Sequence, residues 1–385
     1  MTSKSRPWHL KFILVIIAAL AVGGYLTWEA QKDHLRLPYR MVAGTTAALT
    51  NPGDILFIGD ANVEAWAQVA PILQDKVSAQ LKHPLTLSFK ALPAGGIQRV
   101  TAYLAELLAP PAMPSNTSPA PAYAKPQMVV YVMGRQELQE CKMRPTMLAA
   151  ITHQFALENN PRWSTLMMIL PFLRPWLIDP GEPLVLAQPA PWPKMDEPTE
   201  LKYRELATQL YAKELALLAN FLKQQQITLA VLTAPLNLTT ISEAWPSSNS
   251  LTLQKLLAEV SELLRAGKVR PAAQMLEPLK QFPGNAHTWF FAGKIASLQG
   301  DFATSMQNFK KAKSFSAERD EALPIYNILA RQAASTLNFA VYDLAAAAEK
   351  YLWAQGPVDS AGYPAENFYQ EQAPELGSFL AKLLY

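Results

Sequence analysis

The chain has 385 residues, half of them apolar, and its 34 Lys and Arg residues nearly balance 31 Asp and Glu residues, for a net charge of +3. This length and composition allow more than one buried core, and the small net charge, with no basic cluster on a predicted face, gives no reason to expect nucleic-acid binding. The single cysteine, Cys141, excludes an internal disulfide bond.

The first predicted element is the apolar segment 12–28, which contains no charged residue and follows the cations Lys4 and Lys11. Its 17 residues are near the lower limit for a bilayer-spanning helix. Cations on its N-terminal side predict that this end stays in the cytoplasm and that the rest of the chain lies on the opposite side of the membrane. The alternative is a cleaved signal peptide, with Ala19-Leu20-Ala21 as its cleavage site.

Strand patterns alternate with helix patterns in the body of the chain. Residues 55–59 form a short apolar run bounded by turn residues, as a buried parallel strand does. Further strands are predicted at 85–91, 128–133, 227–233 and 339–343, and helices at 69–82, 100–108, 200–225, 319–338 and 374–385. This order predicts an α/β fold of three layers, with helices on both faces of a parallel sheet.

Between residues 251 and 315 the pattern changes to an internal repeat. Segments 256–279 and 289–312 match at a period of 33, so that Gly267 corresponds to Gly300. The second copy resembles a tetratricopeptide (TPR) repeat, a pair of helices that approach closely at small residues. The residues that carry this likeness are Trp289, Gly293, Gly300, Phe302, Phe309 and Ala312. Because two such repeats seldom hold together alone, we expect them to pack against the rest of the chain.

Five short motifs follow one another along the chain. They are Gly59-Asp60, Gly95-Gly96, Gly134-Arg135-Gln136-Glu137, Pro235-Leu236-Asn237-Leu238 and Ala373-Pro374-Glu375-Leu376-Gly377. Their order resembles that of SGNH (GDSL-type) hydrolases, in particular membrane-anchored bacterial members with a TPR insertion. The likeness covers roughly residues 50 to 385.

The resemblance implies an SGNH-hydrolase-like, flavodoxin-like domain interrupted by the repeats. The implied organisation is a cytoplasmic N-terminus and transmembrane anchor at 1–28, the first part of the hydrolase-like domain at 29–250, the TPR-like insertion at 251–315 and the closing part of the domain at 316–385. It also implies a single-pass protein of the bacterial inner membrane, held by residues 12–28, with its body in the periplasm.

The catalytic residues of active relatives have no counterpart here. In those relatives, a serine after the first Gly-Asp is the nucleophile, an asparagine of the third motif helps form the oxyanion hole, and a C-terminal Asp-x-x-His supplies the base. This chain has Ala61 and Gln136 at the first two positions, and Phe368 and Glu371 where the Asp and His should be. Losing a nucleophile or base costs on the order of 10⁶ in turnover. We therefore expect a pseudoenzyme, although an active ester hydrolase or O-acyltransferase with another nucleophile, such as Ser88 or Ser360, is the alternative.

The remaining crevice candidates lie at the ends of predicted strands. They are Asp60, Ala61, Asn62, Gly95, Gly96, Gln136 and Glu137. Asp60 and Glu137 could act as an acid–base pair or hold a cation. The alternative is structural: Asp60 caps the next helix and Glu137 pairs with an arginine. We expect neither a cofactor nor a metal.

These observations favour a membrane-tethered, non-catalytic component. Its crevice would bind a carbohydrate or acyl-bearing ligand, its TPR face would bind a protein partner, and its setting would be envelope polysaccharide processing, on fold analogy. A pure interaction module with a filled crevice is a further alternative.

Overall fold

The computed structural model describes residues 39–41, 53–92, 96–108, 125–135, 137, 184–186, 197–238, 241, 251–281, 285–316, 323–354 and 364–385. The chain divides into two compact units, Met1–Val42 with Met143–Leu186, and Ala43–Lys142 with Ala187–Tyr385. In the first unit the described residues are strands β1 (Tyr39–Met41) and β5 (Leu184–Leu186), which pair in parallel.

The predicted anchor at 12–28 lies outside the described residues. Among the helices that the structure describes, none is both long and apolar enough to cross a membrane.

The second unit contains a five-stranded, entirely parallel sheet. Its strands are β2 (Ile55–Gly59), β3 (Leu87–Ala91), β4 (Met128–Val132), β6 (Thr228–Leu232) and β7 (Ala340–Tyr342). Their spatial order is β3-β2-β4-β6-β7. Numbered along the chain within this sheet, the order is 2-1-3-4-5, one of the two common orders of doubly wound α/β sheets. The prediction of an α/β fold with a parallel sheet is confirmed.

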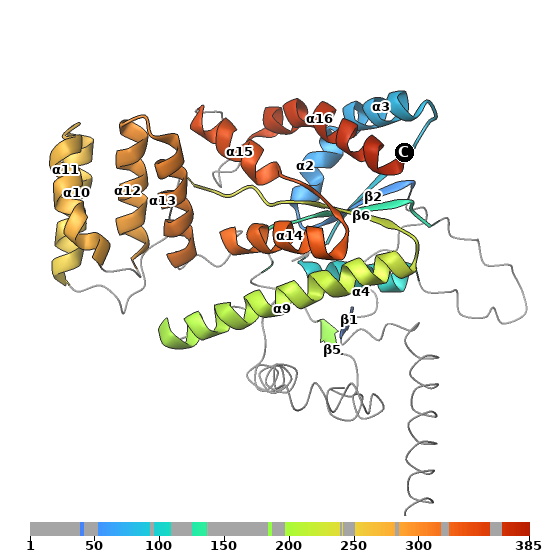
Figure 1. Ribbon diagram of the computed structural model, residues 1–385, viewed down its shortest axis with the longest axis horizontal. Helices are drawn as coiled ribbons and strands as arrows, with labels where there is room; N and C mark the ends of the chain where they lie inside the picture. Colours follow the sequence, from blue (N-terminus) through green and yellow to red (C-terminus); the bar gives the residue numbers. More distant parts are fainter. Residues whose placement is uncertain are drawn as a thin grey trace, which may run out of the picture. The chain divides into compact units, whose positions relative to one another are not determined.

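Helices cover both faces of the sheet (Figure 1). Ile55 and Phe57 of β2 point into a core with α2 (Asn62–Gln68), α3 (Ala70–Leu81), α15 (Leu344–Trp353) and α16 (Glu366–Leu384). On the other face lie α4 (Ile97–Leu107), α9 (Glu197–Gln224) and α14 (Pro324–Leu337), which contact β2, β6 and β7 respectively. Because successive strand residues alternate between two covered faces, β2 and β4 are buried at every position.

The helix predictions fail at three places. The sequence pattern predicts that the last helix begins at Pro374, but α16 begins at Glu366 and Pro374 lies inside it. Buried Phe368 and Tyr369 anchor its first turns in the core, and this packing outweighs the helix-breaking effect of proline. Helix α15 has no counterpart among the predicted helices. Helix α2 likewise has no counterpart among the predicted helices.

Residues 251–316 form two helical pairs. The first is α10 (Leu251–Arg265) with α11 (Val269–Leu276), followed by the 3₁₀ helix η2 (Glu277–Gln281), and the second is α12 (Ala286–Leu298) with α13 (Phe302–Phe315). The ends of α10 and α12, and the starts of α11 and α13, are each 33 residues apart. The expected contact with the rest of the chain is confirmed by the ring contact of Phe302 with Trp353, at 5.0 Å between ring centroids.

Candidate functional site

The carboxyl ends of β2 and β4 meet at one edge of the sheet, where doubly wound folds bind ligands. Asp60 follows β2, and Gly134, Arg135 and Glu137 follow β4. The N-terminus of α4, at Ile97, reaches the same place because its backbone N–H donates to Glu137 Oε2 at 3.1 Å. The structure therefore brings together three of the predicted crevice segments.

Asp60 joins two turns through both of its carboxylate oxygens. Oδ1 accepts from the Asn62 backbone N–H at 2.8 Å, and Oδ2 accepts from the Arg135 N–H at 2.7 Å. A Cβ at position 134 would overlap the Asp60 carboxylate, so only glycine leaves room for it. With 3% of its surface exposed, Asp60 has its pKa raised by burial, although these two N–H groups and the Arg135 charge oppose the rise. Its contacts are those of a structural link.

Glu137 is buried in a site that disfavours its charge. The Tyr131 hydroxyl donates to Oε1, while Ile97 N–H donates to Oε2. Burial, which outweighs these hydrogen bonds, raises the pKa of Glu137 to about 8, and the nearby Asp60 charge adds to the rise. At neutral pH the side chain is therefore mostly protonated. Within the described residues, Glu137 forms no ion pair with an arginine, and its carboxyl group is bonded to a tyrosine hydroxyl and backbone N–H groups instead.

Ala61 and Asn62 lie just beyond Asp60, where α2 begins. Ala61 is exposed and occupies the N-cap position of α2, so a methyl group stands at this point of the edge. The side-chain Nδ2 of Asn62 is buried and has no hydrogen-bond partner within the described residues. The same holds for Nε1 of Trp66, one turn later. Buried donors without partners are rare and mark a departure from ordinary packing.

The remaining candidate residues, together with the cysteine and the histidines of the chain, lie elsewhere or outside the described residues. Gly95, Gln136, Cys141, Ser360 and three histidines (His9, His34 and His153) are among the latter. His83 follows α3 and lies near Asp54, at the opposite edge of the sheet, and His287 is on α12. Phe368 is fully buried in α16, and Glu371 is an exposed residue of the same helix. Within the described residues, no group of three or more His, Cys, Asp or Glu side chains could hold a metal.

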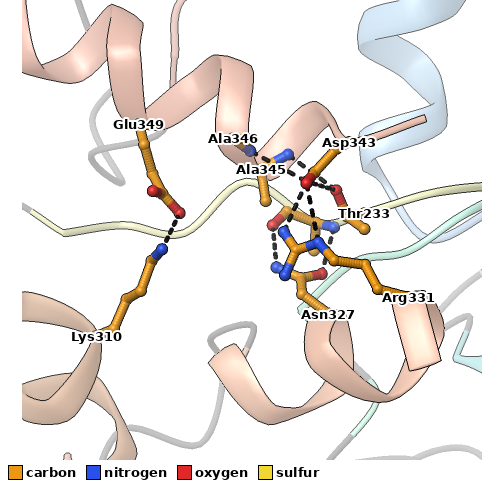
Figure 2. A network of polar contacts seen from close by, with 9 residues as sticks. Thr233, Lys310, Asn327, Arg331, Asp343, Ala345, Ala346 and Glu349 are labelled. Atoms are coloured by element: carbon orange, nitrogen blue, oxygen red, sulfur yellow. Dashed lines mark hydrogen bonds and ion pairs between the residues drawn. The ribbon is translucent and has the colours of Figure 1, made fainter. Parts of the chain in front are cut away.

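A second polar cluster, not predicted from the sequence, lies at the ends of β6 and β7 (Figure 2). Asn327 of α14 donates through Nδ2 to the Ala234 carbonyl at 2.8 Å and accepts from the Ala234 N–H at 2.9 Å. Thr233 Oγ1 donates to Asp343 Oδ1 at 3.0 Å and accepts from the Ala345 N–H at 2.9 Å. These bonds fix the chain as it leaves both strands.

Asp343 is the centre of this second cluster. It caps α15 by accepting from the Ala346 N–H at 3.2 Å, and Arg331 donates to both of its oxygens, at 2.9 and 2.6 Å. Burial alone would raise the pKa of Asp343, but the Arg331 hydrogen bonds and charge hold it below its ordinary value. An aspartate before Leu344-Ala-Ala-Ala is a recognisable helix start, and this signal could have revealed α15.

The predicted packing residues of the second repeat come together between α12 and α13. A Cβ on Gly293 would lie 2.5 Å from the Phe309 ring, and Ser305 Oγ donates to the Gly293 carbonyl at 3.0 Å. Ala312 is fully buried. Lys311 Nζ lies 3.3 Å from the centre of the Trp289 ring. Gly300 lies just after α12, with φ of +79°. Phe302 instead contacts Trp353 of α15.

Comparison of the chain with protein-family models, curated proteins and solved structures finds no match. The functional interpretation therefore depends on the sheet edge and on the helical pairs themselves.

Proposed function

We propose that this protein is a non-catalytic member of the SGNH-hydrolase-like group that binds a ligand or scaffolds a partner. One observation carries the proposal: Ala61 stands directly after Gly59-Asp60 at the carboxyl end of β2, where active relatives carry their serine. A methyl group has neither a lone pair for attack nor a proton to transfer.

The surroundings of Ala61 support the same conclusion. Both oxygens of Asp60 are engaged by backbone N–H groups, and Glu137 is enclosed by Tyr131 and Ile97. Of the two histidines in the described part of the chain, His83 lies at the opposite edge of the sheet and His287 is on α12, in the helical pairs. A serine-type mechanism needs a nucleophile and a base within hydrogen-bonding reach of each other.

The helical pairs support an interaction role. The close approach of α12 and α13 at Gly293, and the matched bounds of the two pairs, are typical of TPR repeats. We propose that they bind a protein partner, while the sheet edge binds a carbohydrate or acyl-bearing ligand in envelope polysaccharide processing.

Residues 12–28 would hold the protein in the inner membrane with its body in the periplasm. Alkaline extraction of membranes should release a chain that starts at residue 29 but retain the full chain, and release of both contradicts the anchor.

A fluorophosphonate probe tests the absence of an activated nucleophile. The purified native chain should gain no more label than the same chain unfolded by heat, measured by intact-protein mass. A single adduct that forms only on the native chain would identify a working nucleophile and overturn the proposal. Peptide mapping would then show whether Ser88, Ser360 or Cys141 carries it.

A further inference from the structure

The helical pairs concentrate positive charge that the rest of the chain lacks. Residues 251–316 contain nine Lys and Arg against four Asp and Glu, a net charge of +5, whereas the remaining residues have 25 against 27, a net charge of −2. Part of this charge is neutralised locally: Lys310 pairs with Glu349 at 2.7 Å, and Lys280 pairs with Glu277 at 2.7 Å. Within the described residues, the other exposed cations of the segment form no ion pair.

Three of those cations lie on or beside the first helices of the two pairs. Arg265 ends α10, Lys268 lies in the turn that follows, and Lys294 is on α12, all exposed. No carboxylate forms an ion pair with any of the three in the described part of the chain. Lys294 Nζ instead lies 4.6 Å from the centre of the Phe290 ring, an arrangement that leaves the cation free to meet an anion.

An apolar side chain lies beside one of these cations, Lys294. Leu298 is 61% exposed, one of the few large apolar residues of the described chain left in water, and it lies four residues after Lys294 on the same face of α12. Helices α10 and α12 contact each other, and short connections through α11 make them run in the same direction (Figure 1). The period of 33 places Arg265 on α10 at the position that Leu298 occupies on α12.

We infer that this surface, formed by Arg265, Lys268, Lys294 and Leu298, binds an acidic segment of a partner protein that carries apolar residues among its carboxylates. The inference rests on the proposed interaction role of the helical pairs and adds the chemistry of the partner. Cations without partners and a single exposed leucine match alternating carboxylates and apolar side chains. The remaining chain has a net negative charge, which repels an acidic segment. Such a segment would therefore bind at the helical pairs in preference to the rest of the chain.

Fluorescence anisotropy of the full chain with two labelled 12-residue peptides tests the inference. One peptide alternates Glu and Leu, and the other has Gln in place of every Glu. The acidic peptide should bind at least about tenfold more tightly than its Gln counterpart, and its affinity should fall when salt rises from 0.05 to 0.5 M, since these charges are exposed. Equal binding of the two peptides, or of neither, contradicts the inference.

Variants then locate the binding surface. Arg265→Glu with Lys294→Glu should weaken the acidic peptide about tenfold or more, and Leu298→Ala should weaken it severalfold. Lys223→Glu with Lys382→Glu makes the same change of charge on exposed residues outside the pairs and should have little effect. Circular dichroism confirms that each variant is folded. Equal losses in both double variants, or equally tight binding of a single-stranded oligonucleotide, would show unspecific attraction and overturn the inference.

The two proposals fail separately. If neither peptide binds and the chain stays unlabelled by the fluorophosphonate, the acidic partner is wrong and the non-catalytic proposal stands. If the native chain is labelled, the proposed function falls whatever the peptides do.

Discussion

Glu137 is a carboxyl group held where its charge cannot be solvated. Tyr131 and Ile97 donate hydrogen bonds to it, yet burial has the larger effect and raises its pKa to about 8, so that the proton stays bound at neutral pH. Asp60, only a short distance along the same edge, has a raised pKa for the same reason. Burial therefore makes both carboxyl groups at this sheet edge harder to ionise than free side chains.

Glu137→Gln should remove one pH dependence of stability. A raised pKa stabilises the folded protein below the unfolded value of 4.5, and this contribution is lost as pH rises towards about 8. The free energy of unfolding of the wild type should therefore fall relative to the variant over this window, by no more than about 1.4 kcal/mol per pH unit. Urea titrations of both proteins from pH 4.5 to 9 measure the difference, because every other titrating group is shared. Parallel profiles would show that Glu137 does not carry this proton.

Helix α15 is held at both ends. Its start is fixed to the ends of β6 and β7 by Asp343 with Thr233, and Glu349 further along pairs with Lys310 of α13 (Figure 2). Trp353, at its end, contacts Phe302 of α13. It therefore links the carboxyl edge of the sheet with the second helical pair.

Two substitutions at Asp343 separate its cap from its charge. Asparagine caps a helix as well as aspartate does, so Asp343→Asn should lose only the ion pair with Arg331, about 0.5 kcal/mol for side chains as exposed as these. Asp343→Ala should cost about 1 kcal/mol more, since the cap is lost too. Thermal melts at pH 7 compare the two. Equal destabilisation by both variants would show that the cap contributes nothing.

Three glycines of the helical pairs should respond in two ways. Gly267 and Gly300 have φ of +70° and +79°, and a Cβ added at either would meet no atom within 4 Å, so alanine at either should cost the same, about 1–2 kcal/mol of backbone strain. Gly293→Ala should be destabilising through its clash with Phe309, and much less so in a Phe309→Ala background. Urea denaturation of the single and double variants measures these costs. Unequal effects at Gly267 and Gly300 would argue against the equivalence of the two pairs.

What the sequence predicts well are the features that depend on local pattern. The buried runs 55–59 and 128–132 indicate central strands, and the period of 33 indicates two equivalent helical pairs. The start of α16 depends on Phe368 and Tyr369 reaching the core, and the Asp343 cluster depends on Arg331 and Thr233, which are distant in sequence. Tertiary contacts of this kind leave no local signal, so Asp60 could be placed at the edge while its bond to Arg135 could not.

On the scale of the molecule, a doubly wound sheet presents an edge where ligands usually bind. Two helical pairs carry excess positive charge, and the second of them contacts α14 and α15 beside the sheet. At that edge the position after Gly59-Asp60 is an alanine, and the carboxyl groups of Asp60 and Glu137 accept hydrogen bonds from backbone N–H groups of the fold. We therefore propose binding, and no ester chemistry, for this protein.

Release of p-nitrophenol from p-nitrophenyl acetate is the measurement closest to that claim. The folded wild type should release it no faster than the same chain unfolded in urea, after each rate is corrected for the rate in the solvent alone. The Ala61→Ser variant should give the same result, because a hydroxyl restored without a base stays unactivated. Saturable release that requires the folded wild-type chain would contradict the account.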